Sequence, residues 1–382
     1  MAVMKGQKMK EETTPNAEGR PANIQRSTLS AQRSTDEILR RQDRWDRATR
    51  RESPPGFLFL VRCADPDQPP RPPLWPDRKQ ERIEWIWDDY QRQMRRAAWL
   101  DDDAVPHLNM FTGTEIFAEA FGCRVHRPSD NMPFALPLIH SAAEVDRIRV
   151  PELSASSLAY LFDMADELQR RAPESIFRLP DVQSPMDIAA LILEKTAFFT
   201  ALIESPDALR ELAGKVRALL TAFLDEWFRR YGTRYVAHYP DYFMTGGMTL
   251  SEDEVGAVNP EMFDEFFLPE LAALSQRYGG IGMHCCAKAR HQWPGFLRIP
   301  NLRVLNICQP LEVAAEAYRF FGRGPLHWHG NLATGPAESW PRQYPAEARF
   351  VIETQAQTPE DARRVAGALH EQRVMSRARK EG

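Results

Sequence analysis

The chain alternates short apolar segments with longer amphipathic segments along most of its length. Runs of β-branched, aromatic and aliphatic residues predict strands at residues 107–111, 176–179, 235–239, 281–284, 304–307, 326–329 and 350–353. Segments with apolar residues at helical spacing lie before and between these runs. They predict helices at residues 80–100, 115–121, 156–171, 185–202, 206–230, 260–276, 311–320 and 359–372.

Four of the predicted helices begin with a polar residue followed by proline: Ser184-Pro185, Ser205-Pro206, Asn259-Pro260 and Thr358-Pro359. The polar residue can accept hydrogen bonds from free helical N–H groups, and proline suits the first helical position. Repeated units of strand, loop and capped helix predict parallel strands joined by right-handed crossovers. Seven or eight such units favour an α/β fold, a single (β/α)8 TIM barrel, over an open doubly wound sheet.

Two segments near the N-terminus depart from this pattern. Residues 1–55 are highly charged, and we expect disorder up to about Thr35, then a solvated or clasping helix over residues 36–51. Residues 65–77 contain six prolines and predict an extended linker or wrap. We therefore expect an N-terminal extension, residues 1–55, and one barrel domain, residues 56–382.

Composition narrows the functional classes. The 382 residues are 43% hydrophobic and carry a net charge of −4, which argues against binding to nucleic acid or a membrane surface. No apolar run is long enough to span a membrane, and no secretory signal precedes the body, so we expect a cytoplasmic protein. Three of the five cysteines, Cys285, Cys286 and Cys308, lie close together in sequence. This spacing favours a thiol or metal site over a disulfide framework.

The strongest candidate for chemistry is His284-Cys285-Cys286, because a barrel places functional residues after its strands. In an extended segment His284 and Cys286 share a face and can bind one metal ion, while Cys285 points away. Imidazole and thiolate together suit zinc, with Cys308 or His329 as third ligand. The alternative is that these are ordinary buried core groups.

Other polar residues also follow predicted strands. We expect catalytic roles for Asp181, Asp241 and Tyr242, substrate binding by Tyr239, His329 and Asn331, and metal binding by His284, Cys286 and Cys308. Asp181 has an alternative role as the turn before the Ser184 cap. Ser251 is expected to cap a short helix, with Glu254 completing a capping box.

Three segments of this chain resemble the uroporphyrinogen decarboxylase-like superfamily. They are residues 184–227, residues 250–286 and the TPEDARR helix start from Thr358, and the similarity extends over about residues 75–375. The superfamily includes porphyrinogen decarboxylases and zinc-dependent methyltransferases that work with corrinoid proteins. The resemblance implies a single (β/α)8 barrel with a deep cleft at the carboxyl ends of its strands.

Two branches of this superfamily, the decarboxylases and the methyltransferases, differ in their sequence motifs. Porphyrin-pathway decarboxylases carry an arginine-containing MRQAGRY-type loop and an FSD-type strand, and neither occurs here. The methyltransferase branch carries HxC and a further cysteine near the last strand, and these three residues bind a zinc ion that activates a thiol. His284 and Cys286 match the first pair, but residues 349–361 contain no cysteine. Cys308, His329 or Glu353 would have to replace it, or the site binds no metal.

Our leading hypothesis is a cytoplasmic, zinc-dependent methyltransferase that moves a methyl group between a corrinoid protein and a thiol or similar acceptor. The second is a metal-independent decarboxylase of a tetrapyrrole or other aromatic acid, in which Asp181 or Asp241 stabilises a protonated pyrrole. Its carboxylate clamps would be Arg124, Arg127 or Arg178. The third is a barrel without catalytic activity. We expect a small-molecule substrate, no nucleic acid or membrane partner, and a monomer or homodimer.

Overall fold

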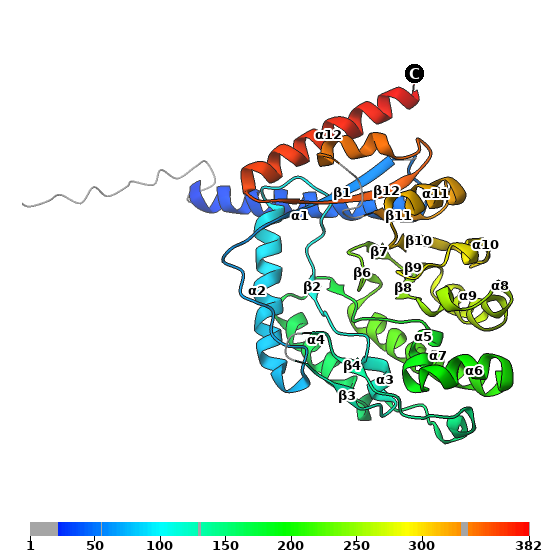
Figure 1. Cartoon of the computed structure of the whole chain (residues 1–382). Helices are drawn as coiled ribbons and strands as arrows, with labels where there is room; N and C mark the ends of the chain where they lie inside the picture. The colour runs from blue at the N-terminus through cyan, green and yellow to red at the C-terminus, as the bar shows by residue number, and fades with distance from the viewer. Residues whose placement is uncertain (1–21, 55, 129–130, 330–334, 382) are drawn as a thin grey trace, which may run out of the picture.

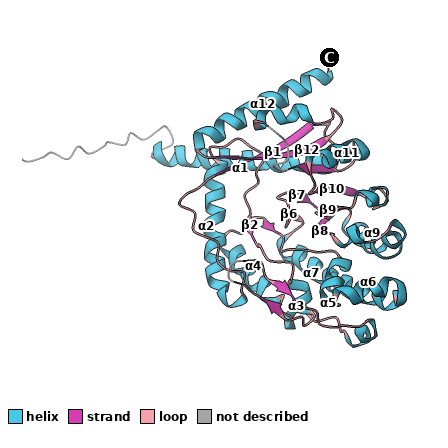
Figure 2. Ribbon diagram, in the orientation of Figure 1, coloured by secondary structure: helices cyan, strands magenta, loops and turns pink. Residues whose placement is uncertain are grey.

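The computed structural model describes residues 22–54, 56–128, 131–329 and 335–381. Its strands form a six-stranded parallel sheet, in the order β1-β12-β11-β10-β9-β8, and a four-stranded sheet, in the order β2-β5-β6-β7. Only the β6–β7 pair of these two sheets is antiparallel. Figures 1 and 2 show the strands at the centre of the molecule with helices around them. The chain therefore has the α/β architecture with parallel strands that its pattern predicts.

The longer strands belong to the six-stranded sheet: β1 Gly56–Cys63, β8 Met248–Ser251, β9 Ile281–Cys285, β10 Leu302–Ile307, β11 Leu326–His329 and β12 Arg349–Ala356. The second sheet has β2 Leu108–Asn109, β5 Phe177–Arg178, β6 Arg234–Val236 and β7 Phe243–Thr245, and a separate antiparallel pair has β3 Val125–His126 and β4 Phe134–Ala135. All seven predicted strands occur, several of them shorter than expected. The sequence pattern missed β1 and β8 of the six-stranded sheet, β7 of the second sheet, and the β3–β4 pair.

Loops that flank the second sheet bond to both outer strands of the six-stranded sheet. At the β8 side, a parallel bridge joins Gln183 to Ser251. At the β1 side, Phe59 N–H and Val61 N–H donate to the carboxylates of Asp103 and Asp102, at 2.8 and 3.0 Å. Side-chain oxygens thus occupy the edge of β1 that faces β2. Within the described residues the ladders form two sheets and not one continuous ring.

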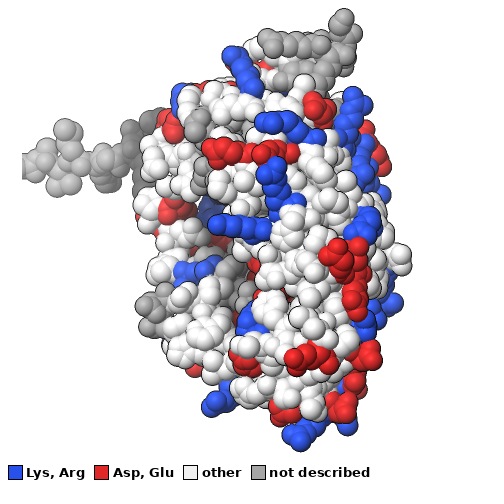
Figure 3. Space-filling model, turned by 45° about the vertical axis from the view of Figure 1, so that its right-hand side comes forward, with Lys and Arg blue, Asp and Glu red and all other residues white. Residues whose placement is uncertain are grey.

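The main helices are α1 Ala22–Thr49, α2 Lys79–Ala97, α3 Ile116–Ala120, α4 Ala159–Arg171, α5 Pro185–Ile192, α6 Lys195–Glu204, α7 Pro206–Tyr231, α8 Pro260–Met262, α9 Leu268–Tyr278, α10 Trp293–Phe296, α11 Leu311–Phe321 and α12 Pro359–Glu381. None of the described helices is both long enough and apolar enough to cross a bilayer. Figure 3 shows acidic and basic side chains interspersed over one face.

Two predicted helices are interrupted. The helix predicted at residues 185–202 divides into α5 and α6, because Glu194 N–H donates to Ile139 O at 2.9 Å instead of continuing the helical ladder. The Glu194 side chain then caps α6 by accepting from Ala197 N–H at 3.0 Å. The helix predicted at residues 260–276 contains a π-helical segment, Phe263–Phe267, between α8 and α9.

Three of the four predicted caps form hydrogen bonds. Ser184 Oγ accepts from Asp187 N–H at 3.0 Å, Asn259 Oδ1 from Met262 N–H at 2.8 Å, and Thr358 Oγ1 from Asp361 N–H at 3.1 Å. Ser205 makes no such bond with its side chain, although proline follows it. Proline at the first helical position is thus the more reliable of the two signals here.

The N-terminal helix α1 clasps the body. It begins at Ala22, so residues 22–35, expected to be disordered, are helical, while residues 1–21 lie outside the described part of the chain. Trp45 is 1% exposed and donates from Nε1 to Asp103 O at 2.7 Å. Arg41 is equally buried and donates to Leu100 O at 2.7 Å and to Asp102 Oδ1 at 3.2 Å.

Asp103 is the most connected of these buried groups. It is fully buried, and its Oδ1 accepts from Arg44 Nε at 2.7 Å while Arg373 of α12 donates to both of its oxygens. Burial alone would raise the pKa of Asp103, but the charges of Arg373 and Arg44 outweigh it and lower that pKa. One ionised carboxylate therefore ties β1, α1 and α12 together.

We predict that Asp103→Asn lowers the free energy of unfolding by about 3–5 kcal/mol, because it leaves Arg44 and Arg373 without their shared buried counter-charge. Urea unfolding followed by tryptophan fluorescence measures the change. The control is Asp43→Asn, whose ion pair with Arg47 is exposed and worth about 0.5 kcal/mol or less. A similar loss in both variants would contradict the role assigned to Asp103.

Candidate functional site

Three potential metal ligands converge at the carboxyl end of β9. The ligand atoms of Asp253, His284 and Cys286 all lie within 4.8 Å of one another. His284 is the fourth residue of β9, and Cys286 directly follows the strand. Asp253 comes from the loop after β8, which is the neighbour of β9 in the sheet. This group offers one nitrogen, one sulfur and one oxygen ligand.

Asp253 and Cys286 are joined by two hydrogen bonds. Cys286 N–H donates to Asp253 Oδ1 at 2.6 Å, and the thiol donates to Oδ2 at 3.0 Å. Partial burial, and then the adjacent carboxylate, raise the pKa of the Cys286 thiol to about 12. The thiol therefore keeps its proton at neutral pH. A cation bound between the two groups would take the place of that proton.

His284 is held in an orientation that suits a ligand. Its Nδ1 is hydrogen-bonded to Asn306 Oδ1 of β10, and its ring packs edge-on against Tyr239, with centroids 4.7 Å apart. Burial lowers the pKa of His284, so the imidazole is neutral. A neutral imidazole fixed through Nδ1 presents Nε2 to a metal, and such outer-shell partners are typical of metal sites.

Cys285 lies on the opposite face of β9, as the alternation of side chains predicts. It is buried and lines an apolar cavity of about 240 Å³ with Trp293, Phe296 and Ile307. Burial raises the pKa of this thiol well above its usual value. It is thus an inert core residue beside the ligand group.

The loop that carries Asp253 is held by hydrogen bonds to the side chain of Asp187 of α5. The two oxygens of Asp187 accept from Asp253 N–H at 2.9 Å and from Glu254 N–H at 3.0 Å. The prediction that Ser251 caps this turn is wrong. Ser251 is the last residue of β8, and its Oγ is hydrogen-bonded to His238 Nε2 at 2.9 Å. The buried Asp187 carboxylate, far away in sequence, does the capping.

Glu252 adjoins Asp187 and is completely buried. Burial, followed by the neighbouring carboxyl group, raises the pKa of Glu252 well above its usual value, and burial raises that of Asp187 to about 7. Two carboxyl groups this close share a proton instead of both ionising. The site therefore rests on a carboxyl pair with reduced charge.

A second polar cluster lies at the carboxyl ends of β1, β5 and β12. Arg62 donates to Glu353 Oε1 at 2.7 Å and is paired with Asp241, while Arg178 lies 3.1 Å from Asp241 Oδ1. Burial would raise the pKa of Asp241, but the charges of Arg62 and Arg178 outweigh it and lower that pKa. Asp241 is therefore an ionised, paired carboxylate and not a proton donor. Glu353 is likewise occupied by Arg62.

The remaining predicted residues fall at different places. Asp181 follows β5, receives Gln183 Nε2 at Oδ1, and burial raises its pKa to about 6. Tyr242 is 2% exposed and packs edge-on against Trp45 of α1, within the core. Cys308 follows β10 and is exposed, and its N–H donates to Cys285 O at 3.0 Å. Within the described part of the chain, Cys308 is not among the ligands that converge with Asp253.

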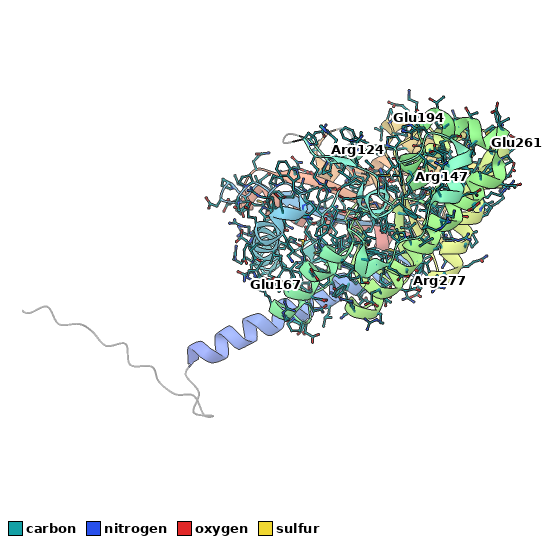
Figure 4. The ribbon with its side chains drawn as sticks, turned by 90° about the horizontal axis from the view of Figure 1, so that it is seen from below. Arg124, Arg147, Glu167, Glu194, Glu261 and Arg277 are labelled. Carbon is teal, nitrogen blue, oxygen red and sulfur yellow. The ribbon has the colours of Figure 1, made fainter. Side chains whose placement is uncertain are left out.

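His329, one of the predicted substrate-binding residues, is the last residue of β11. The backbone of His329 pairs with Ile352 of β12. Asn331 lies outside the described residues. Of the three arginines suggested as clamps, Arg178 alone joins the polar cluster; Arg127 pairs with Glu119, and Arg124 is exposed (Figure 4).

Asp253 is the residue that sequence reasoning missed. The sequence of residues 251–254 predicts a helix cap, which accounts for their acidic side chains without a metal. The available signal was positional, because Asp253 follows a strand whose neighbour carries His284 and Cys286. Without β8 among the predicted strands, that signal could not be used.

Comparisons with known proteins place this site within a matched region. The family model described as "Uroporphyrinogen decarboxylase (URO-D)" matches residues 60–335, which include Asp253, His284 and Cys286. Among solved structures, a "methyltransferase from Methanosarcina mazei" superposes with a TM-score of 0.57 at 11% sequence identity. The match covers 88% of this chain and 97% of that one. No curated protein matches the chain.

We predict that Asp241→Asn changes how stability depends on pH. Since the folded-state pKa of Asp241 is depressed, its ionised form contributes stability that is present above about pH 4 and is lost as pH falls toward the folded pKa. The variant should be about 1–3 kcal/mol less stable at pH 7. It should also lose less stability than the wild type between about pH 5 and pH 2.

Urea unfolding at several pH values checks this prediction. Asp207→Asn is the matched control, because the Asp207 side chain is 97% exposed. Parallel stability curves for the wild type and Asp241→Asn would contradict the assigned ion pairs.

Proposed function

Because the chain belongs to the uroporphyrinogen decarboxylase (URO-D) family, we propose that it is a zinc-dependent methyltransferase. It would move a methyl group between a corrinoid protein and a thiol or similar small-molecule acceptor. The observation that carries this proposal is the convergence of Asp253, His284 and Cys286 at one end of the parallel sheet. The structural similarity to a methyltransferase adds support at the level of the fold.

The donor set fits zinc. One imidazole, one thiolate and one carboxylate are ligands that zinc accepts, and three protein ligands leave a position open for a substrate. Asp253 would take the place of the cysteine that is absent from residues 349–361. Bound zinc supplies Lewis-acid chemistry, which lowers the pKa of a thiol acceptor.

The chain's own residues would prepare this centre. Cys286 would release its proton on metal binding, and Asn306 would hold the His284 proton on Nδ1 and leave Nε2 free to bind the metal. Tyr239, which packs against His284 and is 46% exposed, would border the open position. Asp187 would keep Asp253 in place through the loop backbone.

We further propose that residues 56–382 form one closed (β/α)8 barrel. Two contacts support this closure: Asp102 and Asp103 accept hydrogen bonds from β1, and Gln183 bridges to Ser251 of β8. They join both outer strands of the six-stranded sheet to loops that flank the second sheet. The five cysteines are free, and a thiolate ligand needs a reducing compartment, so we place the protein in the cytoplasm. Its partner would be a corrinoid protein, with the chain as a monomer or homodimer.

A second candidate is the metal-independent decarboxylase. Arg62 and Arg178 favour it, since they lie at the strand ends where substrate carboxylates would be bound. Asp181, whose pKa is about 6, would stabilise a protonated pyrrole. Asp241 is less suited to that role than the sequence suggested, because both arginines already neutralise it.

We predict that the purified protein binds one zinc ion per chain. Asp253→Asn, His284→Ala and Cys286→Ser should each weaken zinc binding by at least about 100-fold, because each removes a ligand. Competition with a chromogenic chelator measures the affinity, and Cys308→Ser is the matched control for loss of a nearby thiol. Equal losses in Cys308→Ser and none in Asp253→Asn would assign the third ligand to Cys308. Zinc well below one per chain, unchanged by His284→Ala, would exclude the metal site.

We predict that the zinc-loaded protein demethylates methylcobalamin in the presence of a thiol, and that Asp253→Asn lowers the rate at least about 100-fold. The absorbance change of the corrinoid reports the reaction. Carbon dioxide release from uroporphyrinogen without added metal, and no methyl transfer to any of a panel of thiols, would instead support the decarboxylase.

A further inference from the structure

A small cavity lies at the end of the sheet opposite the candidate metal site. Its volume is about 60 Å³, and its walls include the starts of three strands at Gly56, Leu326 and Arg349. Because these strands are parallel, their amino ends face away from the carboxyl end that carries His284. Four arginines line the cavity: Arg44 and Arg47 of α1, Arg349 of β12 and Arg373 of α12.

Arg349 is the least compensated of these four arginines. It is 7% exposed, and its Nη2 donates to the backbone carbonyls of Ser53 and Arg51 at 2.8 and 3.0 Å. Its Nε has no hydrogen-bond partner, and no carboxylate of the described residues pairs with it. Burial, and then repulsion from Arg51 and Arg323, lower the pKa of Arg349. A buried guanidinium without a paired carboxylate is stabilised when an anion binds beside it.

The other three arginines also line this cavity, and their N–H groups are only partly used by carboxylates of the protein. Arg44 and Arg373 share the carboxylate of Asp103, and Arg44 also pairs with Glu37 at 3.1 Å. Nε of Arg373 has no hydrogen-bond partner among the described residues. Arg47 is paired only through Nε, with Asp43, and its side chain is 51% exposed. Positive charge at this end therefore exceeds the negative charge supplied by the described residues. Most of the remaining wall is apolar, including Ala48, Pro54 and Phe57, and a low-dielectric wall strengthens electrostatic attraction.

We propose that this cavity binds one tetrahedral oxyanion of the phosphate class. Guanidinium groups present planar, paired donors that match phosphate oxygens, which makes arginine clusters suited to this ligand. The volume holds about two water molecules or a single such anion. A whole nucleotide does not fit, so only inorganic phosphate or the terminal phosphoryl group of a larger molecule can enter.

The bound anion would join three elements that are distant in sequence. Arg47 lies on α1, Arg349 begins β12 and Arg373 lies on α12. An anion held among them would stabilise the folded protein by linkage, without any contact with the metal site. This inference does not depend on the proposed methyl transfer.

Thermal unfolding with and without phosphate tests the proposal. At constant ionic strength, about 10 mM phosphate should raise the Tm of the full chain by about 2–4 °C relative to chloride. Arg47→Gln should remove at least half of that rise. This variant is chosen because Arg47 is half exposed and its replacement leaves the buried contacts of Arg349 intact. Arg229→Gln, at an exposed arginine paired with Glu226 on α7, is the matched control and should keep the full rise.

Equilibrium dialysis with radiolabelled phosphate supplies a second measurement that does not depend on stability. We expect about one phosphate per chain in the wild type and an affinity at least about 10-fold weaker in Arg349→Gln. Competition by glycerol phosphate as well as sulfate would show that a phosphoryl group suffices; competition by sulfate alone would restrict the ligand to a free anion. An equal Tm rise in phosphate and chloride, or full phosphate binding in both Arg47→Gln and Arg349→Gln, would overturn the proposal.

Discussion

The fold depends on how the N–H groups along the outer edge of β1, which has no neighbouring strand in the described part of the chain, are hydrogen-bonded. An edge strand presents unpaired N–H groups, and here the carboxylates of Asp102 and Asp103 accept those of Val61 and Phe59 in place of a neighbouring strand. Such buried charges are stable only when they are paired. Arg41 and Arg44 of α1, together with Arg373 of α12, supply the opposite charge. The terminal helices are therefore part of the body because the β1 edge requires their arginines.

Carboxylates also accept backbone N–H groups at the candidate metal site. Asp187 accepts two backbone N–H groups of the loop after β8, and Asp253 in turn accepts the N–H of Cys286. Each carboxylate fixes a loop that has no ladder of its own. This chain of contacts links α5 to the end of β9, so the position of Asp253 relative to His284 is set by the packing of α5. The site is thus positioned by α5 and by the ends of β8 and β9.

The sequence predicted the parts of this structure that local pattern controls. Alternation of side chains placed His284 and Cys286 on one face and Cys285 on the other, and the Ser184 cap was identified from two residues. Tertiary contacts decided the rest. The division of residues 185–202 depends on Ile139, and the Ser251 turn is capped by Asp187, both distant in sequence. The run 56–63 follows a charged segment and two prolines, and its role as a strand depends on pairing with β12.

These contacts also bear on the cysteine that the last strand lacks. Glu353 of β12 is engaged by Arg62, whereas Asp253 already bonds both the backbone and the thiol of Cys286. A carboxylate from the β8 loop is thus better placed to complete the donor set than the last strand. Aspartate carries the same charge as a cysteine thiolate, so this exchange would leave the net charge of a zinc centre unchanged. A carboxylate oxygen donates less electron density to zinc than a thiolate sulfur does. The zinc would therefore be a stronger Lewis acid, and a bound thiol would ionise more easily.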